Sequence, residues 1–204
     1  MGNLRHDLAS KPAAPDLSVL GDMRLRLGRV HEFCGPARRT LALRVAARLE
    51  GPVIWIRPGW QAERLNPEGV LPLGVDPGRL IFADPRRAED ILWCAEESLR
   101  CGAVSLVVCE LPSLPGLTPV RRLHLAAQAG AEMMGITPLG LLLAQARGGV
   151  PGVESRWYMT FAHGLNEKDG WRLERRRARS DPPATWHITA DGQTHPLAAP
   201  QVIG

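Results

Sequence analysis

The chain has 204 residues, 45% of them hydrophobic and 23% charged, with a formal net charge of +4 and a pI near 9.2. This length fits one globular domain with a sizeable core. No run approaches the roughly 20 apolar residues of a membrane span, and the N-terminus lacks the apolar core of a signal peptide, so we expect a cytoplasmic protein.

The two ends of the chain differ in composition from its middle. Residues 1–17 are polar and rich in proline and alanine, which predicts a flexible N-terminal arm. Residues 193–204 show no hydrophobic period and predict a loose C-terminal tail. We therefore expect a single domain over residues 18–192.

Within this domain, short apolar runs alternate with segments of helical periodicity. The irregular region 58–78, rich in proline and glycine, predicts a loop. The alternation of strands and helices predicts an α/β fold with a parallel central sheet flanked by helices on both faces. The expected strands are 29–34, 53–56, 80–83, 104–110 and 139–144, and the expected helices run over 38–49, from an Asp84–Pro85 start to Gly102, and from a Thr118–Pro119 start onward.

The hydrophobic pattern changes after Gly149, where apolar and polar residues alternate with a period of two. Trp157, Trp171 and Trp186 each begin or join an apolar row. Such alternation predicts antiparallel strands with one buried face, and we expect the three tryptophans on that face.

The segment after the first strand resembles a nucleotide-binding P-loop without its loop. A P-loop places G-x-x-x-x-G-K-[ST] between a strand and a helix, so that backbone amides surround the phosphates. Here the turn Gly35-Pro36 is followed after one residue by Arg38-Arg39-Thr40, with no second glycine and no lysine. The residues alone allow either a degenerate P-loop or an ordinary strand–turn–helix unit of an α/β domain.

The frame around this turn resembles that of RecA-type recombinases, in E-x-x-G-P before the loop and T-L-x-L after it. The resemblance places Arg38 in the lysine position and Arg39 in the Ser/Thr position, and a shift by one residue remains open. Glu110, at the end of a strand, would be either the relic of the acid that helps to hold magnesium or an interface residue. Glu32 is expected to pair with a basic neighbour, Arg29 or Arg38.

Several longer stretches, in order, resemble the ImuA family, which are RecA-like accessory proteins of bacterial SOS mutagenesis. The resemblance implies a RecA-like core, a parallel central sheet flanked by helices and extended by C-terminal antiparallel strands. The stretches are V-H-E-F-C-G-P-A-R-R-T-L-A-L (30–43), G-P-V-I-W-I-R-P (51–58), A-E-D-I-L-W-C-A-E-E-S-L-R-C-G-A-V (88–104), R-R-L-H-L-A-A-Q-A-G (121–130) and W-R-L-E-R-R-R-A-R (171–179).

The ImuA resemblance implies a catalytically inactive accessory protein of translesion synthesis, with no catalytic residues, cofactor or metal. The implied partners are an inactive Y-family polymerase homologue (ImuB-like), RecA, and an error-prone replicative-type polymerase. Two alternatives remain open at this point. One is a SulA-type cell-division inhibitor, and the other is a weak ATPase with an altered P-loop.

The strongest local charge feature is a cluster of arginines near the C-terminus. If the segment is a regular strand, Arg175, Arg177 and Arg179 point to one side, and Arg172 and Arg176 to the other. We expect this cluster to bind a partner. An acidic protein, direct weak contact with DNA, and a solvated strand edge that uses charge to prevent aggregation are the alternatives.

Overall fold

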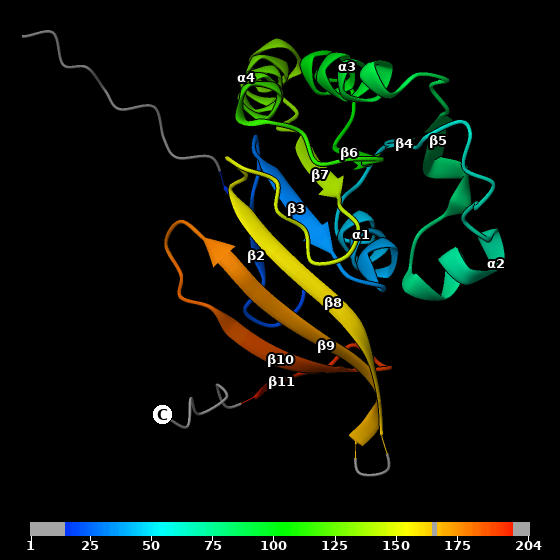
Figure 1. Ribbon diagram of the computed structural model, residues 1–204, viewed down its shortest axis with the longest axis vertical. Helices are drawn as coiled ribbons and strands as arrows, with labels where there is room; N and C mark the ends of the chain where they lie inside the picture. Colours follow the sequence, from blue (N-terminus) through cyan, green and yellow to red (C-terminus); the bar gives the residue numbers. More distant parts are fainter. Residues whose placement is uncertain (1–14, 165–166, 198–204) are drawn as a thin grey trace, which may run out of the picture.

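The computed structural model describes residues 15–164 and 167–197. Its centre is a nine-stranded sheet with the order β11-β10-β9-β8-β3-β7-β6-β4-β5. The six strands from β8 to β5 run parallel, and β8 to β11 pair as an antiparallel meander (Figure 1). This is the expected parallel sheet with an antiparallel extension.

The strands at the centre of the sheet are buried on both faces. Every residue of β3 (Val30–Cys34), β6 (Leu106–Glu110) and β7 (Leu139–Leu143) is buried. They are flanked by β4 (Val53–Ile56) and the edge strand β5 (Leu80–Ala83). Continuous apolar runs of this kind are typical of parallel strands that are covered by helices on both sides.

Helices cover the two faces of the parallel region unequally. Helix α1 (Arg38–Ala46) packs on one face, together with the small sheet of β1 (Asp16–Ser18) and β2 (Arg24–Arg26). Helices α3 (Ala88–Arg100) and α4 (Leu117–Met134) pack on the opposite face (Figure 1). No helix in the described part of the chain is long and apolar enough to cross a membrane.

The antiparallel extension comprises β8 (Ser155–Gly164), β9 (Glu167–Ala178), β10 (Ala184–Thr189) and β11 (Thr194–Leu197). Trp157 and Trp186 are buried on its inner face, and Trp171 is partly buried against the same core. The predicted face of the three tryptophans is therefore confirmed.

Four expected boundaries are wrong. Helix α3 begins at Ala88 after the extended residue Arg87, and the Asp84 carboxylate binds Arg57 instead of capping a helix. Helix α4 begins at Leu117, so Thr118 lies inside its first turn. The expected loop 58–78 contains helix α2 (Pro67–Val70) and the 3₁₀ turns Leu71–Leu73 and Pro77–Arg79.

The fourth difference concerns the ends of the expected domain. Strand β1 begins at Asp16, within the expected arm, and strand β11 covers Thr194–Leu197, within the expected tail. The rest of the arm, residues 1–14, and the rest of the tail, residues 198–204, lie outside the described residues.

Candidate functional site: a closed remnant of a phosphate loop

The parallel strands end at one edge of the sheet, and the P-loop remnant lies there. In open α/β sheets, ligands bind in the crevice outside the carboxyl ends of the strands, where successive connections leave to opposite faces. Helix α1 follows β3 on one face, whereas α4 follows β6 on the other. The turn at Gly35 and the carboxylate of Glu110 therefore lie at the edge of the sheet where ligands of such folds bind.

The backbone of the turn after β3 is already hydrogen-bonded within the protein. The Gly35 amide donates to the Ala146 carbonyl at 3.1 Å, and the Ala37 amide donates to the Met159 carbonyl at 3.1 Å. Gly35 has a φ of +91°, and a Cβ there would lie 2.4 Å from the Met159 oxygen. The turn is thus held against β8, and these two amides do not face an anion.

Glu110 forms an ion pair with the residue in the Ser/Thr position of the frame. Arg39 donates from Nε to one Glu110 oxygen at 3.0 Å and from Nη2 to the other at 2.6 Å. The Trp55 indole also donates to Glu110, at 2.8 Å, and the Glu110 side chain is only 7% exposed. Burial lowers the pKa of the Arg39 guanidinium, but hydrogen bonding and the charge of Glu110 outweigh it, so that the pKa is raised above its usual range.

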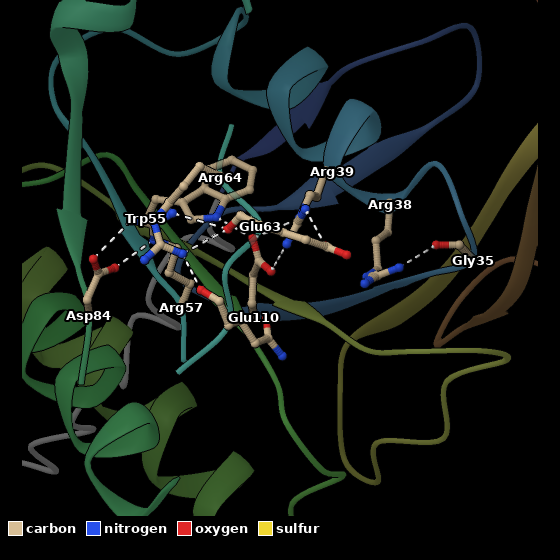
Figure 2. Close-up of polar contacts among 10 residues, drawn as sticks. Gly35, Arg38, Arg39, Trp55, Arg57, Glu63, Arg64, Asp84 and Glu110 are labelled. Carbon is tan, nitrogen blue, oxygen red and sulfur yellow. Dashed lines mark hydrogen bonds and ion pairs between the residues drawn. The ribbon is translucent and has the colours of Figure 1, made fainter. Parts of the chain in front are cut away.

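This ion pair is extended by the segment that follows β4. Glu63 accepts a hydrogen bond from Arg39 at 3.1 Å, and its carbonyl accepts from Arg57 at 3.3 Å. Arg57 also binds Asp84 with two hydrogen bonds, of 2.6 and 2.9 Å, which lower the pKa of Asp84. Figure 2 shows these side chains converging from different elements on one network.

The remaining residues of the P-loop frame stay outside this network. Arg38 donates to the Gly35 carbonyl at 3.1 Å and lies apart from the other arginines (Figure 2). Pro36 is exposed, and Thr40 is half-buried in the first turn of α1. Of the sequence-predicted residues, the structure thus brings Arg39 and Glu110 together, whereas Arg38 contacts only the Gly35 carbonyl.

The residues present do not fit a magnesium–nucleotide complex. In P-loop enzymes, the Ser/Thr of the loop and the acid on the neighbouring strand hold Mg²⁺ between them. Here the guanidinium of Arg39 lies directly against the carboxylate of Glu110. A cationic side chain thus takes the place of a cation, and no three His, Cys, Asp or Glu residues gather as a metal site within 15–164 and 167–197.

Glu32 has a structural role, but its predicted partner is wrong. Its side chain is fully buried and pairs with Arg156 of β8. It also accepts hydrogen bonds from the amides of Gly149, at 2.6 Å, and Val150, at 3.1 Å. Glu32 therefore fixes the β7–β8 connection, whose Ala146 carbonyl binds the Gly35 amide.

The arginine cluster does not alternate as predicted, because β9 contains a bulge. Trp157 pairs with Arg175 and Arg156 pairs with Arg177, which leaves Arg176 as the additional residue. Arg175 lies against the rings of Trp157 and Trp186, with its guanidinium carbon 5.8 and 5.3 Å from their centroids. It is only 11% exposed and also hydrogen-bonds the Pro182 carbonyl.

The other arginines of the cluster occupy different surroundings. Arg176 lies over the Tyr158 ring, 3.7 Å from its centroid, and Arg177 is exposed. Arg179 lies beyond the end of β9, where it pairs with Glu154 at 3.3 Å. The cluster is therefore divided between the inner face, the outer face and the loop after β9.

Sequence reasoning missed four residues of the network, which are Trp55, Glu63, Arg57 and Asp84. Arg57 and Asp84 each follow the end of a parallel strand, so their proximity could have been expected from the rule that such ends share one edge. Glu63 lies in an irregular segment without a period, and nothing in the local sequence indicated it.

Comparison with known proteins places the chain among the relatives of RecA. RecA of Acidothermus cellulolyticus is 32% identical over 161 residues, which cover 74% of this chain and 44% of that protein. RecA of Nocardioides sp. is 32% identical over 170 residues, 76% of this chain and 46% of that protein. RecA of Staphylococcus aureus strain JH9 is 34% identical over 155 residues, 70% and 41% respectively. The chain thus spans less than half the length of these relatives.

No protein-family model matches the chain. The solved structure of SulA from Pseudomonas aeruginosa aligns with a TM-score of 0.45 and 22% identity, covering 57% of this chain and 98% of that protein. A likeness at this level does not establish a shared fold or function. The RecA matches, together with the parallel sheet and its antiparallel extension, show that the chain is a distant homologue of RecA with a RecA-like core.

Proposed function

We propose that the protein is a catalytically inactive RecA-like accessory protein of SOS-induced translesion synthesis, which acts in the cytoplasm through contacts with other proteins. The observation that carries the inactive part of this proposal is the ion pair of Arg39 with Glu110, together with the turn amides that bind backbone carbonyls. A nucleotide would have to break this pair and displace β8 from the turn. We therefore expect neither binding nor hydrolysis of ATP.

The proposed role in mutagenesis comes from the ImuA resemblance of the sequence. By that resemblance, the partners are an inactive Y-family polymerase homologue, RecA and an error-prone replicative-type polymerase. A RecA-like core that does not turn over nucleotide retains its surfaces, and a heterologous contact with another RecA-like protein would use them.

One surface supports action through protein contacts. Strand β5 lies at an edge of the large sheet and contains neither a charged residue nor a proline. Its Ile81 and Phe82 side chains are 52% and 44% exposed. Proteins usually protect such edges with charge or proline, as Pro196 does in β11 at the opposite edge. An unprotected apolar edge is typical of a strand that pairs with another chain.

The proposal is tested by co-purification and by mutation frequency. The tagged chain is mixed separately with the polymerase homologue, with RecA and with the tubulin-like division protein that a SulA-type inhibitor would bind. We expect recovery of the first two, reduced recovery with Ile81→Lys, and unchanged recovery with the control Leu71→Lys, since Leu71 is exposed elsewhere. Deletion of the gene is expected to lower mutation frequency after DNA damage.

Two results would contradict the proposal. Recovery of the division protein alone would favour the inhibitor. Calorimetric binding of ATP, with turnover that is lost in Arg38→Ala, would favour an ATPase.

A further inference from the structure

Several arginines that do not pack against the core lie on the outer face of β9. Thr160 pairs with Arg172, Tyr158 with Glu174 and Arg156 with Arg177, so that these side chains share the face opposite to the buried tryptophans. The bulge brings Arg176 to the same face, over Tyr158. Arg176 also donates to the carbonyl of Arg147, at 3.3 Å, which places the β7–β8 loop beside it. We call Arg147, Arg172, Arg176 and Arg177 the β9 arginine face.

This face carries more positive charge than its surroundings neutralise. Glu174 is shared between Arg172, at 3.2 Å, and Arg176, at 2.9 Å. Within the described ranges, neither Arg147 nor Arg177 takes part in an ion pair, and both are exposed. Glu174 thus pairs with only two of the four arginines of this face, and closely spaced like charges repel one another unless an anionic surface meets them.

A groove of about 480 Å³ adjoins the arginine face, between β9 and the β10–β11 hairpin. The charged residues that line it are Arg172, Glu174, Arg175 and Arg176. Pro183, Pro196 and Leu197 contribute apolar surface, and Leu197 is 41% exposed. An apolar groove beside a row of arginines matches a segment that carries both acidic and apolar side chains.

The residues that follow β11 do not supply the complementary charge. The segment that follows Leu197, residues 198–204, contains no aspartate or glutamate. Among residues 15–164 and 167–197, the carboxylates that form ion pairs at this face are Glu174 and, through Arg156, the buried Glu32.

An acidic protein segment fits this face better than a nucleic acid. Proteins that bind single strands expose aromatic rings on which bases stack, but here Arg176 covers Tyr158. Arginine forks bind carboxylates in a bidentate manner, and the apolar groove has no counterpart in a phosphate chain.

We propose that the β9 arginine face and its groove bind an extended acidic segment of a partner protein, with an apolar side chain of that segment in the groove. This inference rests on the proposed function, in which the chain acts through protein contacts, and it names the chemistry of one partner surface.

The test measures fluorescence anisotropy of a short labelled peptide of repeating Glu-Asp-Leu. We expect the wild type to bind it and the affinity to fall as salt rises. Arg147→Glu/Arg177→Glu is expected to lower the affinity by about tenfold or more, which corresponds to about 1.4 kcal/mol. Neither arginine forms an ion pair with another described residue, so the variant is expected to keep the circular dichroism spectrum and melting temperature of the wild type.

Two controls separate a specific site from general charge. Arg86→Glu/Arg121→Glu changes the net charge by the same amount at exposed positions on other elements, and it is expected to bind the peptide as the wild type does. Arg147→Lys/Arg177→Lys is expected to bind with intermediate affinity, because lysine retains the charge without the planar fork. Leu197→Asp is expected to weaken binding through the groove.

The inference would be overturned by the absence of peptide binding, by equal losses in the two charge-reversed variants, or by tighter binding of oligothymidylate through the same arginines. These results are independent of the co-purification experiment. If the peptide binds as expected while no polymerase homologue or RecA is recovered, the acidic-segment site stands and the role in translesion synthesis fails.

Discussion

Removal of Arg39 tests the claim that a side-chain cation balances the buried carboxylate of Glu110. The Glu110 side chain is 7% exposed in the wild type, and in Arg39→Ala the Trp55 indole is its only remaining donor among the described residues. Loss of one partner of a buried pair usually costs about 3–5 kcal/mol. Because the Arg39 side chain is 23% exposed, we expect the lower end of this range, about 3 kcal/mol.

The reverse substitution is expected to cost less. In Glu110→Gln, Arg39 remains partly solvated and retains its ion pair with Glu63 at 3.1 Å. The glutamine still accepts a hydrogen bond from Trp55, so we expect a cost of about 1–2 kcal/mol. The double variant Arg39→Ala/Glu110→Gln is expected to be more stable than Arg39→Ala alone, because it contains no unpaired buried charge.

Urea unfolding at neutral pH measures these differences as shifts of the midpoint at constant slope. A loss of about 3 kcal/mol also corresponds to a fall of about 6–12 °C in melting temperature for a chain of this size. Arg86→Ala serves as the exposed control, with an expected change below about 0.5 kcal/mol. The reasoning is refuted if Glu110→Gln destabilises the protein more than Arg39→Ala does, or if the latter costs less than about 1 kcal/mol.

Three further predictions concern pH, the turn and the bulge. Burial lowers the pKa of His31 from 6.5 to about 4, so the unfolded chain takes up a proton first as the pH falls, and the free energy of unfolding is expected to drop by roughly 3 kcal/mol between pH 6.5 and 4. Urea midpoints measured at several pH values should depend less on pH in His31→Asn than in the wild type. Gly35→Ala is expected to lower the free energy of unfolding by at least about 2 kcal/mol, because Gly35 has a positive φ and an added Cβ would contact a β8 carbonyl. Gly116→Ala, where an added Cβ meets open space, should leave the melting temperature unchanged in thermal melts of both variants. Arg175→Glu is expected to destabilise the fold by about 2–3 kcal/mol, since a carboxylate would be buried against tryptophan rings, whereas Arg177→Glu is expected to leave the melting temperature unchanged. Equal effects of the two substitutions would contradict the assignment of these arginines to different faces of β9.

Strand β9 contains one residue more than its partner β8, and this extra residue limits what a period of two can predict. A period of two correctly placed Trp157, Trp171 and Trp186, because each belongs to a regular row of buried side chains. The same period failed for Arg177, because a bulge at Arg176 adds one residue to β9 without a partner in β8. Nothing in a run of arginines marks the position of such a bulge.

The sequence itself determined the α/β class, the order of strands and helices along the chain, and the shortened turn between β3 and α1. They depend on local quantities, which are hydrophobic period, chain length between elements, and the conformational limits of glycine and proline. The absence of a second glycine and a lysine after Gly35 could also be read directly.

Only the tertiary structure decided what takes the place of the phosphate loop. Arg39 and Glu110 are separated by 71 positions in the chain, and Arg156 and Glu32 by 124. Sequence reasoning proposed Arg29 or Arg38 for Glu32 because it could weigh only nearby charges. The actual partners meet because parallel strands bring their ends to one edge of the sheet and because β8 adds beside β3. Ion pairing at that edge therefore depends on strand order, which is set by the packing of the whole sheet and not by any local segment.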